Sequence, residues 1–77
     1  MKNFVYYGEL FNIYGFLLTK KQQDIFALYY NENLSLSEIA QEKGVSKSYV
    51  GKVINDIEQK LDYYEKNIKH YELLNNK

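Results

Sequence analysis

The sequence predicts an all-α fold, a four-helix helix-turn-helix domain whose last helix extends beyond the domain core. Apolar residues recur at spacings of three and four along most of the chain, which is the period of an amphipathic helix. Capping residues interrupt this period at Thr19, Ser35 and Ser46 and so divide the chain into four helices. Residues 36–56 also carry the spacing of small, glycine and branched apolar residues that a helix-turn-helix needs. The 77 residues of the chain predict a single domain over 1–77.

The N-terminal helix is expected over residues 1–18. Gly8 and Gly15 lie within it, and a glycine weakens a helix by up to about 1 kcal/mol relative to alanine. The simplest interpretation is a loosely ended helix, and the alternative is close packing of another helix against Gly8. One face carries the apolar side chains Phe4, Tyr7, Phe11, Tyr14, Leu17 and Leu18.

The helix-turn-helix core is expected over residues 19–55. Thr19 and Gln22 fit a capping box that opens the second helix, and the turn-forming residues 31–33 end it. Ser35 and Glu38 form a second capping box at the start of a short third helix. The second helix turns one apolar face inward, with Ile25, Leu28 and Tyr29.

The turn between the third and fourth helices has the residues that a close helix crossing requires. Ala40 is small enough for the fourth helix to cross it, and Gly44 permits the left-handed backbone of the turn. Ser46 then caps the fourth helix. The predicted core of the motif comprises Ile39, Ala40, Gly44, Val45, Val50 and Val53.

The fourth helix is the predicted recognition helix, because the N-terminal part of the second helix of this motif enters the major groove of DNA. Ser48 and Asn55 can read base edges, the lysines can hold phosphates, and Tyr49 can pack on a base or sugar. The predicted nucleic-acid contacts are Ser46, Lys47, Ser48, Tyr49, Lys52 and Asn55.

A solvated surface is the alternative interpretation of the same residues. The chain has ten lysines, ten acids and no formal net charge, which argues against avid binding to phosphate backbones. Asp56 and Glu58 follow the recognition segment and would repel phosphates. We therefore expect weak affinity for bare duplex DNA unless dimerisation doubles the site.

Residues 56–77 are expected to continue the fourth helix, with no helix breaker before Asn75. Its apolar residues advance in heptads, which keeps a narrow stripe facing a partner. Beyond Leu61 the stripe needs cover from the N-terminal helix, from a second copy, or from both. The charged residues beside it, among them Glu58 and Asp62, are expected on an exposed flank. A homodimer is predicted, with a seam formed by Leu61, Tyr64, Ile68 and Tyr71.

Composition excludes several classes of function. Cysteine is absent and His70 is the one histidine, so neither a disulfide nor a metal site is expected, and no cofactor is predicted. No paired carboxylates, Ser/His/Asp set or glycine-rich phosphate loop points to an enzyme. The apolar runs are too short for membrane insertion and the N-terminus lacks a secretion signal, so we expect a cytoplasmic protein.

A further pattern extends over most of the chain, in the segments Leu10 to Tyr14, Leu17 to Gln22, Leu28 to Tyr30, Leu34 to Ala40 and Val45 to Lys47, and it ends near Tyr64. Together these segments resemble the YlxM family of small helix-turn-helix proteins. The resemblance implies an all-helical fold similar to the region-four domain of bacterial sigma factors, which recognises promoter DNA. It also implies a role in the signal recognition particle pathway, through DNA, the particle's RNA or the particle's protein. The alternative is a protein that binds the particle's GTPase, uses the helix-turn-helix as a scaffold and has little intrinsic DNA binding.

Overall fold

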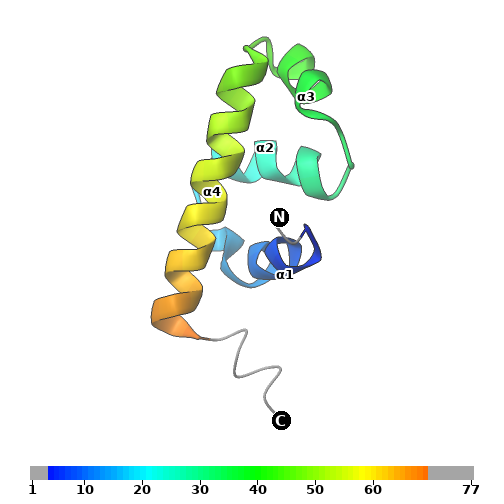
Figure 1. The fold of residues 1–77 in the computed structure, drawn as a ribbon. Coiled ribbons are helices and arrows are strands. Elements are labelled where there is room, and N and C mark those ends of the chain that lie inside the picture. Colours follow the sequence, from blue (N-terminus) through cyan, green and yellow to red (C-terminus); the bar gives the residue numbers. More distant parts are fainter. Residues whose placement is uncertain (1–3, 70–77) are drawn as a thin grey trace.

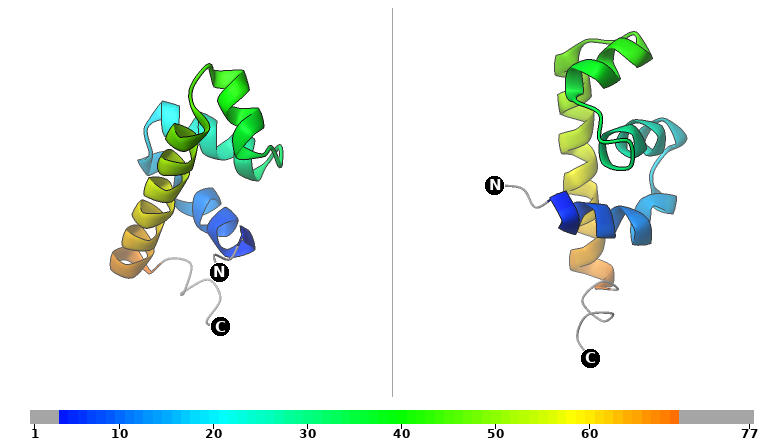
Figure 2. Two further views of the ribbon diagram at one scale, coloured as in Figure 1. Left: turned by 45° about the horizontal axis from the view of Figure 1, so that its top comes forward. Right: turned by 90° about the vertical axis from the view of Figure 1, so that its right-hand side faces the viewer.

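The computed structural model describes residues 4–69, and within this range the chain folds into four α-helices and one short 3₁₀ turn. The longest helix is α4, and the three shorter helices α3, α2 and α1 pack one after another along one side of it (Figures 1 and 2). This is the all-helical fold that the sequence predicts. The elements are α1 (Phe4–Tyr14), the 3₁₀ turn η1 (Gly15–Leu17), α2 (Lys20–Tyr30), α3 (Leu36–Lys43) and α4 (Lys47–Ile68).

The predicted capping residues begin α2, α3 and α4. Thr19 and Gln22 exchange hydrogen bonds between side chain and backbone, and so do Ser35 and Glu38, which completes both capping boxes. The Ser46 hydroxyl accepts a hydrogen bond from the Tyr49 backbone N–H at 3.0 Å. The helix starts expected from the sequence are therefore confirmed.

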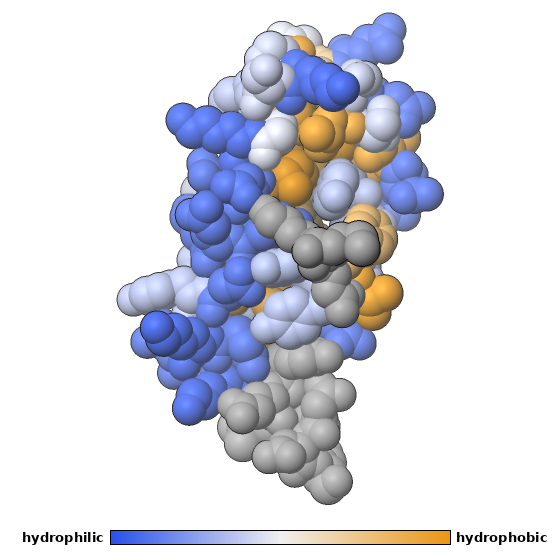
Figure 3. Space-filling model, viewed as in Figure 1, coloured by the Kyte–Doolittle hydropathy of each residue, from blue (hydrophilic) through white to orange (hydrophobic). Residues whose placement is uncertain are grey.

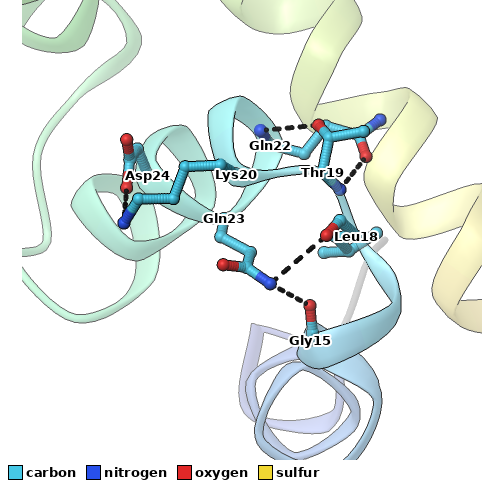
Figure 4. A network of polar contacts seen from close by, with 7 residues as sticks. All are labelled: Gly15, Leu18, Thr19, Lys20, Gln22, Gln23 and Asp24. Atoms are coloured by element: carbon cyan, nitrogen blue, oxygen red, sulfur yellow. Dashed lines mark hydrogen bonds and ion pairs between the residues drawn. The ribbon is translucent and has the colours of Figure 1, made fainter.

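The N-terminal helix is shorter than the predicted span of 1–18. It ends at Tyr14, η1 follows, and Leu18 adopts an extended backbone that leads to the cap of α2. The Gln23 side-chain amide of α2 donates to the carbonyl oxygens of Gly15 at 2.8 Å and Leu18 at 3.2 Å (Figure 4). The tightened turn is stable because α2 supplies partners for carbonyl groups that a longer helix would have satisfied internally.

The core lies along the inner face of α4 and is shared by all four helices. Leu61, a predicted dimer-seam residue, is 0% exposed and belongs to a core cluster to which α1 contributes Leu10 and Tyr14. The N-terminal helix therefore packs against the apolar stripe of α4, as one of the expected arrangements required. Because Leu61 is buried within the chain, its assignment to a dimer seam is wrong. The buried apolar residues are Leu10, Tyr14, Leu18, Ile25, Phe26, Ile39, Ala40, Val50, Ile54, Ile57 and Leu61.

Tyrosines of α1 bond to acids of α4 and fasten the two helices together. The Tyr7 hydroxyl donates to Asp62 at 2.8 Å, and the Tyr14 hydroxyl donates to Glu65 at 2.5 Å. Glu58 is only 5% exposed. The expectation of an exposed charged flank is therefore wrong for Glu58, because α1 packs against this side of α4.

Gly8 is a site of close approach. A Cβ atom built on Gly8 would lie 1.6 Å from Cζ of Tyr30, so the ring of this α2 residue occupies the space that a side chain would need. The ring is held by Phe4 at 4.7 Å between centroids and by Phe26 at 6.4 Å. The interpretation of Gly8 as the mark of a loosely ended helix is wrong, and close packing is its structural role.

The last helix ends earlier than predicted, at Ile68, where Lys69 takes a left-handed conformation with φ of 59°. Ile68 is 49% exposed, so the apolar stripe loses its cover here. Because helices in proteins are stabilised mainly by packing of their apolar face, the loss of cover accounts for the earlier end. Tyr71, the last predicted seam residue, and His70 lie outside the described residues. Within residues 4–69, each helix is too short or too polar to serve as a transmembrane segment.

Candidate nucleic-acid interface

The helix-turn-helix is formed by α3, the turn at Gly44, and α4. Gly44 has φ of 67° and ψ of 37°, and its N–H and that of Val45 bond to carbonyl oxygens near the end of α3. Ile39, Ala40 and Val50 are buried between the two helices. Val45 and Val53 are half-buried against the same cluster. The turn thus places the start of α4 at the upper end of the molecule in Figure 1.

The six predicted nucleic-acid contacts are all exposed residues at Ser46 and in the first half of α4. The Ser46 oxygen already accepts the hydrogen bond of the helix cap, so its hydroxyl can contact a ligand chiefly as a donor. The other side chains are of the types that contact bases and phosphates. The exposed residues are Ser46, Lys47, Ser48, Tyr49, Lys52 and Asn55.

Three lysines that the sequence did not assign to the interface lie beside the start of α4. Lys20 and Lys21 begin α2, Lys43 ends α3, and together with Tyr49 they line a groove of about 440 Å³. The Lys21 ammonium lies 5.1 Å from the centroid of the Tyr49 ring, a cation–π contact. The two lysines after Thr19 can be seen in the sequence, but no sequence pattern predicts that the start of α2 lies beside the start of α4.

Lysines occupy unfavourable positions at the starts of two helices. Lys20 and Lys21 stand in the first turn of α2 and Lys47 in the first turn of α4, and neither turn contains an acid. A cation at the positive end of the helix dipole costs roughly 0.3–1 kcal/mol. Lys20 is paired with Asp24 at 3.2 Å across one turn of α2 (Figure 4). The helix dipole therefore disfavours these lysines at their positions, and the pair with Asp24 offsets part of that cost for Lys20.

The acids expected to repel phosphates differ in their position. Asp56 is exposed, whereas Glu58 is buried on the side of α4 that faces α1. Only one of the two carboxylates therefore faces solvent beside the recognition segment. Figure 3 shows hydrophilic residues along the outer side of α4 and apolar residues where α4 meets the shorter helices.

Comparison with known proteins identifies the family. The chain matches, over residues 1–77, the family model described as "Putative helix-turn-helix protein, YlxM / p13 like". The chain belongs to the UPF0122 family. This confirms the resemblance seen in the sequence and identifies the chain as a member of a helix-turn-helix family.

Several UPF0122 proteins are similar to this chain. The protein of Desulforamulus reducens is 41% identical over 68 residues, which cover 88% of this chain and 58% of the relative. That of Clostridium kluyveri is 45% identical over 56 residues, with 73% and 50% covered. That of Mycoplasma capricolum is 46% identical over 66 residues, with 77% and 58% covered. The chain thus spans between half and about three-fifths of the length of these curated UPF0122 proteins. No solved structure matches it.

Proposed function

We propose that this UPF0122 protein is a nucleic-acid-binding accessory protein that contacts its ligand through the first half of α4. The observation that carries the proposal is the division of this helix into two faces. Val50 and Ile54 hold one face in the core, while lysines and hydrogen-bonding side chains are exposed on the other. A rigid helix with that division is what entry into a nucleic-acid groove requires.

Each exposed side chain has a role in the proposed contact. Lys47 and Lys52 neutralise phosphates, and Ser48 and Asn55 offer hydrogen bonds to base edges. Tyr49 offers a ring face to a base or sugar. Because few phosphates are contacted, we expect modest affinity, with a salt slope of about 0.9 for each phosphate contact.

The resemblance to the YlxM family extends the proposal to a cellular role. The expected ligand is DNA or the RNA of the signal recognition particle, and the expected setting is the cytoplasmic protein-targeting pathway. The fold offers no paired carboxylates around a cleft among the described residues, and we propose a regulatory rather than an enzymatic role.

Salt-dependent binding tests the proposal. We expect Lys47→Gln with Lys52→Gln to weaken binding to a labelled duplex, because two phosphate contacts are lost. The slope of log affinity against log salt should fall by about 1.8. The control is Lys60→Gln with Lys66→Gln, which removes the same charge farther along α4. Binding that ignores salt, or equal effects of the two pairs of substitutions, would contradict the proposed interface.

A protein ligand is a second candidate function, favoured by an apolar groove at the far end of α4. Ile13, Tyr14, Phe16 and Ile68 line this groove, and Phe16 is 76% exposed. Exposed apolar patches mark protein interaction sites. The candidate partner is the GTPase of the signal recognition particle. Calorimetric titration of the purified GTPase with the wild type and with Phe16→Ser tests it, and identical heats from both would contradict it.

A further inference from the structure

We propose that the groove between α2 and the helix-turn-helix, lined by Lys20, Lys21, Lys43 and Tyr49, holds backbone phosphates of a DNA duplex whose major groove receives α4. The inference rests on the proposed function, because it requires the start of α4 to enter a nucleic-acid groove. It adds a second contact surface, supplied by α2 and α3, and commits to duplex DNA as the ligand.

Positive charge from separate parts of the chain converges in this groove. Lys20 and Lys21 come from the first turn of α2, and Lys43 comes from the last turn of α3. Asp24 also lines the groove, but it already pairs with Lys20. The three exposed lysines against one acid leave an excess of two positive charges, which complements a phosphate backbone.

The position of the groove matches the path of a DNA strand. A helix seated in the major groove, which is about 12 Å wide, has a phosphate backbone on either side. The Lys21 ammonium lies only 5.1 Å from the ring of Tyr49, which belongs to the first turn of α4. Side chains this close to the inserted helix end face the flanking strand. Lys21 and Lys43 can therefore bind phosphates while Lys47 and Lys52 remain on the recognition helix.

Duplex DNA fits this arrangement better than duplex RNA. The major groove of A-form RNA is deep and narrow, so a helix cannot enter it, and the lysines beside that helix would not come to lie along the flanking strand. The groove also has apolar walls, with Ile25 and Val45 among its lining residues. Such walls can contact sugar atoms next to the phosphates.

Fluorescence anisotropy with a labelled, mixed-sequence DNA duplex tests the inference between about 50 and 200 mM salt. We expect Lys21→Gln with Lys43→Gln to lower the salt slope by about 1.8, because two phosphate contacts are lost. The matched control, Lys60→Gln with Lys66→Gln, removes the same charge elsewhere and should leave the slope nearly unchanged. Circular dichroism confirms that both double variants are folded.

Further arms of the experiment separate the inference from the function on which it rests. A normal slope in Lys21→Gln/Lys43→Gln, with a lowered slope in Lys47→Gln/Lys52→Gln, would overturn the inference and leave the proposed function standing. No binding by the wild type at the lowest salt would overturn both. Equal binding of a matched RNA duplex, with the same dependence on Lys21 and Lys43, would overturn the choice of DNA. Saturable binding of inorganic phosphate in the groove, without any effect of these variants on DNA binding, would also overturn the inference.

Discussion

The contact between Gly8 and Tyr30 predicts that Gly8→Ala destabilises the protein when Tyr30 is present and stabilises it when Tyr30 is replaced by alanine. Replacing Gly8 by alanine gains about 1 kcal/mol of helix propensity. In the folded chain, the added methyl group meets the Tyr30 ring at 1.6 Å and must displace it. Displacement loses the ring contacts with Phe4 and Phe26, and each aromatic pair contributes about 0.5–1.5 kcal/mol. We therefore expect Gly8→Ala to lower the free energy of unfolding by about 1 kcal/mol, a net of these opposing terms.

A double-mutant cycle isolates this contact. In a Tyr30→Ala background the space above Gly8 is empty, so Gly8→Ala should raise the free energy of unfolding by about 1 kcal/mol. The coupling energy between the two sites is then about 2 kcal/mol. Urea denaturation followed by circular dichroism measures all four variants, and the slope of each transition shows whether the unfolding remains comparable. Equal stabilisation by Gly8→Ala in both backgrounds would refute the close approach of Tyr30.

Three further predictions concern the α1–α4 contact, the turn and self-association. Burial, and then the hydrogen bond to Asp62, raise the pKa of Tyr7 above its usual value of 10.0. The stabilising contribution of Tyr7 is therefore complete below about pH 10 and is lost as the pH rises from there toward the raised pKa. Urea denaturation should show that the difference in free energy of unfolding between the wild type and Tyr7→Phe shrinks above about pH 10. A constant difference would contradict this. Gly44→Ala should lower the free energy of unfolding by about 1 kcal/mol, because an alanine is strained at a φ of 67°, and an unchanged denaturation midpoint would contradict it. The homodimer stays a prediction: sedimentation should show a dimer that Ile68→Asp converts to monomer, and a wild type that is only monomeric at micromolar concentration would rule it out.

Local chemistry in the sequence predicted the helix starts and the turn, because the interactions involved span only a few residues. The capping boxes at Thr19 and Ser35 join residues three positions apart. The left-handed backbone at Gly44 likewise follows from the residue type and its place after a periodic segment. In each case the side chain and its backbone partner are neighbours in the chain, so no tertiary arrangement had to be known.

Contacts between distant segments were not predictable in the same way. The sequence left open what covers Leu61, and the answer depends on α1 folding back along α4. Gly8 was misinterpreted because its partner, Tyr30, lies on another helix. Lys21 could not be assigned to the interface, because only the packing of α2 brings it over Tyr49. The candidate site could therefore be predicted along α4, whereas the groove that α2 and Lys43 line beside it could not.

Lys47 allows binding and folding to be separated in one substitution. It occupies the first turn of α4, where a cation opposes the helix dipole at a cost of roughly 0.3–1 kcal/mol. Lys47→Gln removes that cost and also removes a proposed phosphate contact. We therefore expect this variant to unfold at a higher urea concentration and to bind DNA more weakly. Partial misfolding would lower both quantities together, so opposite changes can arise only if Lys47 acts on the ligand. A variant that is less stable than the wild type would contradict the cost assigned to the helix dipole, and one that binds equally well would contradict the assignment of α4 as the recognition helix.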